Sequence, residues 1–362
     1  MAWNWEQNDW PDFRYEKART EEKEKQFLLH SGKWLGVWSH LDEEDGGRLK
    51  IVLLSAEALE SSAIEGEFLD RDSVQSSLQK QLGFKTDGRR VLPSEQGIAE
   101  LMVDVHQNYE EPLTHEKLGR WHEMVTRGRT DLRERGTYRT NPEPMRVVSG
   151  PIHNPTIHYE APPSNRVPRE MDLFLKWFES SRKSLPAMAR ASLAHLRFES
   201  IHPFEDGNGR VGRAIAEYAL SQSLGAPVLL SLSQCITRNR KRYYDELARA
   251  SETMDATRWV EYFSDTILET QERGFRLVEF VLAKTRLLNR LRGRLNPRQQ
   301  KALLRMFAEG IDGFKGGLSS SNYQSITGAS PATATRDLAD MVAKGALVKT
   351  GEHRSTRYWL PL

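Results

Sequence analysis

Side chains suited to phosphate chemistry are concentrated in one short stretch, from His202 to Arg213. It reads HPFEDGNGRVGR and combines an imidazole, a carboxylate, two glycines around an asparagine, and two arginines three residues apart. Gly207 and Gly209 permit positive φ and leave backbone N–H groups uncovered. Because a helix is predicted to begin near Arg210, these N–H groups form an anion-binding nest at a helix N-terminus.

The charged side chains of this stretch have distinct chemical roles. Arg210 and Arg213 share one face of the predicted helix, so both guanidinium groups can reach oxygens of a polyphosphate across the loop. Asp206 offers a hard oxygen ligand, and Mg²⁺ bound to nucleotide phosphates usually takes only one or two protein carboxylates. His202 is left as the acceptor of a proton from an incoming hydroxyl. The open alternative is a helix corner in which His202 caps a helix and the arginines face solvent.

Two predicted helices position these residues. A helix opens near Pro186 and continues to Ile201, because Pro203 disfavours helical geometry at the residue before it. His202 therefore lies in a sharp turn at a helix end. The second helix carries its apolar residues inward until Gly225 stops it. The sequence thus predicts a mainly α fold around the phosphate-binding loop.

The stretch from His202 to Arg213 resembles the Fic family signature, H-P-F-x-[D/E]-G-N-G-R-x-x-R, at every fixed position. Fic enzymes typically transfer the AMP part of ATP to a hydroxyl side chain of a target protein and release pyrophosphate. The resemblance implies ATP as substrate, His202 as general base, and Asp206 as the ligand of Mg²⁺. It also implies a phosphate-binding set: an anion cradle at Gly207, Asn208 and Gly209, a clamp at Arg210, and a γ-phosphate contact at Arg213.

A second segment, Ser61 to Gly66, resembles the inhibitory motif of Fic proteins, [S/T]-x-x-x-E-[G/N]. Its place before the signature implies an N-terminal inhibitory helix. Ser61 and Glu65 are four residues apart and share a helix face, so a carboxylate can be presented to a site elsewhere. If Glu65 pairs with Arg213, it occupies the place of the γ-phosphate. The alternative is a solvated glutamate at a helix end.

A β-hairpin is predicted between Met145 and Pro163, with turn residues at its tip. In Fic proteins a flap in this place pairs with the extended segment of the target, so the resemblance implies a protein partner presenting a Ser, Thr or Tyr hydroxyl. His153 and His158 have no third metal ligand nearby and are interpreted as flap surface.

A basic cluster at 237–242 leads into Tyr243 and Tyr244. Such a cluster is usually a solvated face. By resemblance to Fic relatives, which tend to carry an asparagine or arginine and a tyrosine here, both tyrosines are candidates for nucleotide contacts.

The predicted fold class is a Fic-type helical bundle with a small β-hairpin flap, plus a C-terminal winged helix. We expect an N-terminal helical region at 1–92, which includes the inhibitory helix, a Fic catalytic domain at 93–290, and a winged-helix-like domain at 291–362. In the first region, aromatic residues up to Tyr15 are predicted to anchor the terminus, and an acidic loop at 42–45 to separate two helices.

The winged-helix prediction raises DNA as an open partner. Its recognition helix would carry Thr333, Thr335 and Arg336, and its wing would carry His353 and Arg354. Asp337 and Asp340 dilute the positive charge of that helix, and winged helices also serve as dimer or target-binding modules. DNA binding and a homodimer therefore both stay open.

Composition excludes several classes of protein. With 362 residues, 28% charged and a formal net charge of +2, no global field points to nucleic acid or an anionic membrane. A single cysteine, Cys235, excludes an intramolecular disulfide. No apolar run approaches the length of a membrane span, and the N-terminus lacks signal-peptide features, so a cytoplasmic, bacterial protein without membrane contact is expected.

Two functions of different class follow. The first is a protein adenylyltransferase restrained by its own helix. The second is a regulator whose winged helix binds DNA and whose Fic domain senses nucleotide without turnover. The presence of His202 favours the first, because a sensor needs no base. Within the enzyme class, removal of AMP or use of another nucleotide stays open, and Glu65 could position a water for AMP removal.

Overall fold

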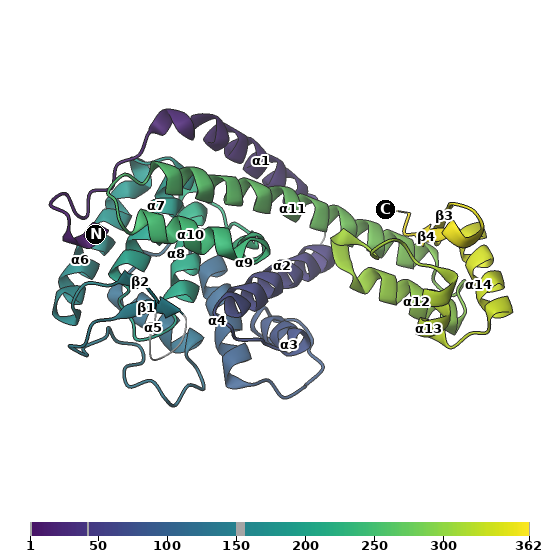
Figure 1. Ribbon diagram of the computed structural model, residues 1–362. Coiled ribbons are helices and arrows are strands. Elements are labelled where there is room, and N and C mark those ends of the chain that lie inside the picture. Colours follow the sequence, from purple (N-terminus) through teal and green to yellow (C-terminus); the bar gives the residue numbers. More distant parts are fainter. Residues whose placement is uncertain (1, 42, 150–155, 362) are drawn as a thin grey trace. The chain divides into compact units, whose positions relative to one another are not determined.

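The computed structural model describes residues 2–149 and 156–361, except residue 42 (Figure 1). Its helices confirm the predicted mainly α class, and the strands of the described residues form two antiparallel pairs. The chain divides into two compact units, Met1–Gly274 and Phe275–Leu362. The predicted domain limits after residues 92 and 290 stay predictions. Within the described residues, no helix combines the length and apolar character needed to cross a membrane.

The first unit begins with an aromatic arm that packs onto the rest of that unit. The side-chain amide of Asn4 is buried and donates to Ser200 Oγ at 2.8 Å. The indole of Trp5 donates to the carbonyl of Glu160 at 2.7 Å. This confirms that the aromatic residues anchor the terminus.

Two long helices follow the arm. Helix α1 (Glu21–Ser39) is continuous through Gly32 and Gly36, and α2 (Glu43–Ile64) ends just before Glu65. The acidic segment predicted as a loop at 42–45 is instead the first turn of α2 from Glu43 onward, whereas Asp42 lies outside the described residues. The loop prediction was wrong because negative side chains stabilise a helix N-terminus through the helix dipole.

Helix α7 (Ala187–Ile201) belongs to the first unit, and every one of its residues is buried. Helix α11 contacts it where the indole of Trp259 donates to the Ser192 carbonyl at 2.8 Å. The other helices after α2 are α3 (Arg71–Gln81), α4 (Pro93–Gln107), α5 (His115–Val125), α6 (Val167–Ser180), α8 (Asn208–Leu224), α9 (Leu232–Arg238), α10 (Arg240–Ala250) and α11 (Thr257–Arg290), the last of which contains the unit boundary. Short 3-10 helices lie at Asn4–Glu6, Lys17–Arg19, Ser164–Arg166, Ser181–Lys183, Gly310–Asp312 and His353–Ser355.

The predicted hairpin is present as β1 (Arg146–Ser149) and β2 (Thr156–Glu160), which pair antiparallel. The register shifts between Val147 and Val148, which marks a β-bulge. Buried Tyr159 fixes the base of the hairpin, since its hydroxyl donates to the carbonyl of Ser200. The tip, which includes His153, lies outside the described residues.

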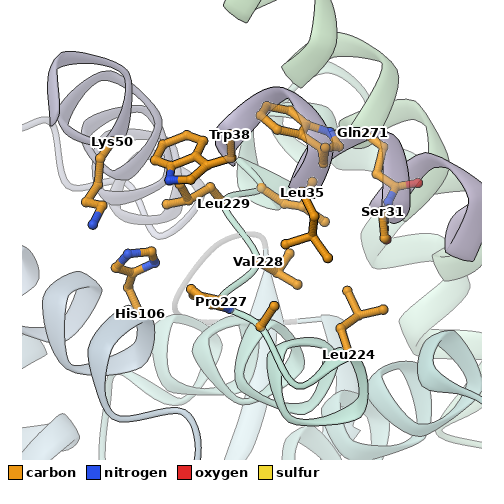
Figure 2. Close-up of a pocket in the computed structure, with 13 residues that line it drawn as sticks. Ser31, Leu35, Trp38, Lys50, His106, Leu224, Pro227, Val228, Leu229 and Gln271 are labelled. Carbon is orange, nitrogen blue, oxygen red and sulfur yellow. Dashed lines mark hydrogen bonds between the residues drawn. The ribbon is translucent and has the colours of Figure 1, made fainter. Parts of the chain in front are cut away.

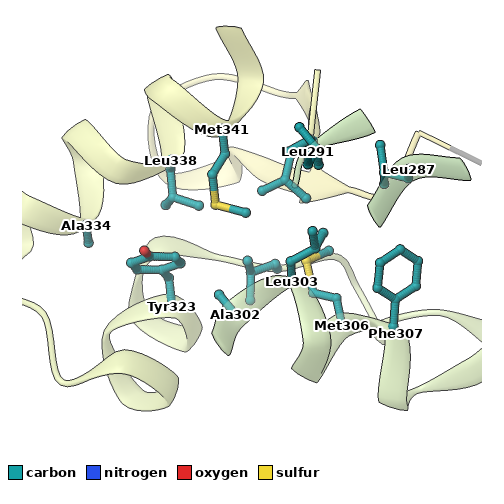
Figure 3. Packing of buried hydrophobic residues seen from close by; sticks show 13 residues of the cluster. Leu287, Leu291, Ala302, Leu303, Met306, Phe307, Tyr323, Ala334, Leu338 and Met341 are labelled. Atoms are coloured by element: carbon teal, nitrogen blue, oxygen red, sulfur yellow. The ribbon is translucent and has the colours of Figure 1, made fainter. Parts of the chain in front are cut away.

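The second unit contains the end of α11, then α12 (Pro297–Ala308), α13 (Ser320–Thr327), α14 (Pro331–Ala343), and the strands β3 (Val348–Thr350) and β4 (Arg357–Trp359). Leu318 adds an isolated antiparallel bridge to Tyr358. Its apolar core includes Leu303, Tyr323, Leu338 and Met341 (Figure 3). These elements follow the predicted order, but the winged-helix assignment stays a prediction.

Two acidic residues of α14 pair with basic neighbours. Asp337 is buried and accepts hydrogen bonds from Arg298 Nε and from the hydroxyl of Tyr323, both at 2.9 Å. Asp340 pairs with Lys344 at 2.6 Å. Both carboxylates therefore offset nearby positive charge, as expected for this helix, and whether the helix contacts DNA stays a prediction.

Candidate functional site

The signature residues lie beside a cavity of about 520 Å³ in the first unit. Glu65, which follows α2, and residues of the β1–β2 hairpin, α7, α8 and α10 contribute to its wall. The predicted site residues that line it are Glu65, His202, Gly209, Tyr243 and Tyr244. Residues far apart in the sequence therefore share one cavity.

His202 is held in an unusual backbone conformation at the C-terminus of α7. Its φ of 49° and ψ of 61° are left-handed, a region that histidine adopts more readily than most residues. Its N–H donates to Phe198 O at 2.9 Å, and its carbonyl accepts from Arg139 Nε at 2.8 Å. These contacts fix the turn that the following proline requires. The sequence reasoning missed Arg139, which comes from a loop far from the signature.

The ionisation of His202 suits a proton acceptor. Burial, and next the charge of Arg139, lower its pKa to about 4, so the ring is neutral near pH 7. Glu199 Oε2 lies 3.7 Å from His202 Nδ1. Burial, and next the charge of Glu65, raise the pKa of Glu199 to about 8, so this neighbour is mostly protonated at neutral pH. The pair is therefore two neutral groups rather than an ion pair.

The loop before α8 is braced by its own asparagine. Asn208 Oδ1 accepts from the N–H of Phe204 at 2.9 Å, and Asn208 Nδ2 donates to the carbonyl of Phe204 at 2.8 Å. Gly207 has a φ of 79°, which favours glycine. The side chain of Asn208 is already hydrogen-bonded inside the loop. In the predicted anion cradle, Asn208 would therefore contribute its backbone N–H rather than its side chain.

Glu65 lies over the start of α8. Its Oε1 is 2.8 Å from Arg213 Nη2, and a Cβ added to Gly209 would lie 2.1 Å from the same oxygen. Arg213 also donates through Nε to Ser61 Oγ at 3.0 Å and through Nη2 to Ser61 O at 2.8 Å. The predicted pair of Glu65 and Arg213 is therefore present. Gly66, with a φ of 84°, follows directly after this carboxylate.

A second carboxylate, which the sequence did not lead us to expect, forms an ion pair with the other arginine of the signature. Glu67 Oε2 lies 2.6 Å from Arg210 Nη1, which also donates to the carbonyl of Val125 at 2.9 Å. The segment Glu65–Gly66–Glu67 thus supplies one carboxylate to each arginine. The acidic residue two positions after Glu65 was the available signal.

Asp206 is ionised but already paired. Its Oδ2 lies 2.6 Å from Arg129 Nη1, and its Oδ1 accepts from the N–H of Gly207 at 2.6 Å. Burial raises the pKa of Asp206, but the Gly207 N–H and Arg129 outweigh it and leave the pKa below its ordinary value.

The part of the chain that the structure describes has no group of three or more potential metal ligands. A nucleotide-bound Mg²⁺ needs fewer protein ligands, and the partly exposed carboxylate of Asp206 fits that requirement. Arg129 would have to release Asp206, and it already has another partner, Asp131, at 2.6 Å.

His122, on α5, supports the same loop. Its ring stacks on Phe204 with centroids 4.1 Å apart. Nδ1 accepts from the N–H of Gly136 at 2.9 Å, which leaves Nε2 to donate to the carbonyl of Asp206 at 3.1 Å. Burial lowers the pKa of His122 to about 4, in agreement with this neutral form. The sequence analysis did not single out His122, which is fully buried against the loop.

The two tyrosines have different environments. Tyr243 is buried, and its hydroxyl lies 3.1 Å from His195 Nε2, so most of this side chain belongs to the core. Tyr244 is half-buried, with the guanidinium of Arg240 5.5 Å from its ring centroid. Tyr244 and Arg240 therefore offer the more accessible surface for a planar base.

Comparisons with known proteins agree with this geometry. Residues 112–220 match the Fic/DOC family, and residues 3–84 match a domain of unknown function, DUF4172. The chain therefore carries a Fic/DOC domain, as the signature predicts.

The similar curated proteins include a probable protein adenylyltransferase of Aquifex aeolicus, 32% identical over 94 residues, which are 26% of this chain and 27% of that protein. The protein adenylyltransferase Fic of Drosophila melanogaster is 34% identical over 101 residues, 28% of this chain and 19% of that protein. The matched part thus spans about a quarter or less of either relative.

Solved structures share the fold. A Fic family protein from Desulfovibrio desulfuricans G20 superposes with a TM-score of 0.53 at 23% identity and covers 93% of this chain and 95% of its own. Residues 134–508 of Fic-1 from C. elegans superpose with a TM-score of 0.51 at 19% identity, and the match covers 72% of this chain and 74% of that one.

Proposed function

We propose that this protein is an adenylyltransferase that moves AMP from ATP to a hydroxyl side chain of a target protein and is held inactive by Glu65. The observation that carries this proposal is the contact of Glu65 with Arg213 above Gly209, in the cavity that also contains His202. One carboxylate thus covers the anion-binding end of α8 beside a neutral imidazole.

In this mechanism His202 accepts the proton of the target hydroxyl. The freed oxygen forms a bond to the α-phosphorus of ATP while the bond from that phosphorus to the oxygen bridging to the β-phosphate breaks, and pyrophosphate leaves. Arg139 holds the carbonyl of His202 and so fixes the backbone turn from which the ring projects.

Phosphate binding falls to the start of α8 and to the two arginines. Backbone N–H groups and the helix dipole favour the phosphates, while Arg210 and Arg213 supply fixed charge. Asp206 would hold Mg²⁺, which neutralises phosphate charge when bound. Glu65 opposes all of this, because its carboxylate uses the charge of Arg213.

The target segment is proposed to add as a strand to the β1–β2 hairpin. Val147 and Val148 line the cavity and are 37% and 50% exposed, so apolar contacts accompany main-chain pairing. Such pairing would bring a side-chain hydroxyl of the target towards His202.

The test compares the intact protein with Glu65→Gly and Glu65→Gly/His202→Ala, each incubated with ATP and Mg²⁺, and measures added AMP by intact mass. Glu44→Gly is the matched control, because Glu44 is an exposed acid at the other end of α2 that pairs with Arg48. We expect AMP on Glu65→Gly alone.

The proposal fails if none of these variants gains AMP, including after addition of a cell extract. In that case the nucleotide-sensing regulator, or an enzyme that removes AMP, becomes the better explanation. AMP on the Glu65→Gly/His202→Ala variant would instead show that His202 is not the base. Replacing ATP with GTP, CTP or UTP in the same assay tests the nucleotide preference.

A further inference from the structure

A second cavity, of about 150 Å³, lies in the first unit among α1, α2, α4, the end of α8 and α11 (Figure 2). It shares no lining residue with the cavity around His202. Its wall is mainly apolar and includes Leu35, Trp38 and Leu229. An apolar cavity of about this volume in another protein holds benzene, so the space fits one aromatic ring.

One end of this cavity is basic. Lys50 of α2 and His106 of α4 lie next to each other there (Figure 2). Lys50 is half-buried and forms no ion pair with any residue that the structure describes. His106 is 7% exposed, and its buried Nδ1 has no hydrogen-bond partner among the described residues. A half-buried cation beside an unpaired ring nitrogen favours an anionic ligand.

The opposite end contains a buried side-chain amide. Gln271 of α11 is 2% exposed and donates through Nε2 to Ser31 Oγ at 2.9 Å. Its Oε1 is buried and has no partner among the described residues. Figure 2 places Gln271 and Ser31 on the other side of the cavity from Lys50 and His106. A donor on the far end of a ligand would satisfy this oxygen.

We propose that this cavity binds a small aromatic carboxylate that carries a hydrogen-bond donor opposite its carboxylate. The carboxylate lies between Lys50 and His106, the ring packs against Leu35 and Trp38, and the donor reaches Gln271. The site is distinct from the AMP-transfer site and does not depend on that proposed function.

The chemistry of the ligand can be tested on the full-length protein without knowledge of its natural source. Isothermal titration and tryptophan fluorescence would be measured with 4-hydroxybenzoate as the probe. Three matched compounds each lack one feature: 4-hydroxybenzyl alcohol lacks the charge, benzoate lacks the donor, and acetate lacks the ring. We expect saturable binding of 4-hydroxybenzoate with a Kd of about 1 mM or tighter, and weaker binding of all three others.

Variants test the position of the site. Lys50→Met keeps an apolar stem but removes the charge, and should weaken binding of 4-hydroxybenzoate about tenfold or more. Arg48→Met is the matched control, since Arg48 is an exposed cation two residues away that pairs with Glu44 and does not line the cavity. It should change the Kd by less than about twofold.

Three results would overturn the proposal: no saturable binding of 4-hydroxybenzoate, equal binding of the alcohol, or an unchanged Kd in Lys50→Met. The first would mean that the cavity does not take this ligand, and the other two that the carboxylate does not lie against Lys50. The compound series uses the unaltered protein, so the first two of these results do not depend on the folding of a variant.

Discussion

The two carboxylates on the signature arginines should oppose ATP binding to different extents. The perturbation is Glu65→Ala or Glu67→Ala, each in a His202→Ala background so that binding is measured without turnover. In both cases the triphosphate competes with a carboxylate for a buried guanidinium. The structure allows the size of each effect to be worked out.

The burial of each ion pair determines how strongly it should oppose ATP binding. Arg213 and Glu65 are 1% and 28% exposed, so their contact resembles a charge-assisted hydrogen bond of about 1.5–3 kcal/mol, which corresponds to roughly 10- to 150-fold in affinity. Glu67 is 34% exposed, so solvent screening reduces its pair with Arg210 to at most about 1 kcal/mol, or up to about fivefold.

The assay is isothermal titration of ATP with Mg²⁺ at low and high salt. We expect Glu65→Ala to tighten ATP binding more than Glu67→Ala, and the smaller effect to shrink further at high salt because it is more exposed. Glu44→Ala in the same background is the control and should leave the affinity unchanged. The reasoning is refuted if Glu65→Ala gives no gain, or a smaller gain than Glu67→Ala.

Three further predictions concern ionisation and the loop. Because burial lowers the pKa of His202 to about 4, kcat/KM for AMP transfer by a Glu65→Gly variant should show no rise near pH 6.5, and a clear titration there would contradict the neutral ring. Asn208→Ala removes both bonds to Phe204 and should lower the free energy of unfolding by about 2–3 kcal/mol in urea titrations, along with activity; unchanged stability would exclude the bracing role. Burial, and next the charge of Glu57, raise the pKa of Glu217 above its unfolded value, so the free energy of unfolding falls as the pH rises above about 4.5. The stability of Glu217→Gln relative to the unaltered protein should therefore increase from pH 5 to 7 in urea titrations. A difference that stays constant with pH would count against this.

Local sequence rules predicted much of the fold and the centre of the site. The proline after His202 marks the C-terminus of α7, and the glycine before Asn208 marks the N-terminus of α8. Both effects act between neighbouring residues. The four-residue spacing of Ser61 and Glu65 likewise predicted their common face. The pairing of Glu65 with Arg213 required the resemblance to Fic proteins, because no local rule connects residues so far apart.

The contacts that sequence reasoning missed are all long-range. Arg139 reaches the carbonyl of His202, Arg129 reaches Asp206, and His122 stacks on a ring of the signature loop. Each of these residues lies in a segment whose local pattern predicts only a helix or a loop. Their partners become visible only after the helices have packed.

Different contacts orient the side chain of Arg213 and neutralise its charge. Two of its hydrogen bonds go to Ser61, one to the hydroxyl and one to the main-chain carbonyl, and a third contact is the ion pair with Glu65. Loss of Glu65 alone therefore leaves the guanidinium aimed but without this ion-pair partner. A nucleotide arriving at such a site meets a cation whose rotamer is already selected, so the entropy of ordering that side chain has been lost during folding rather than during binding.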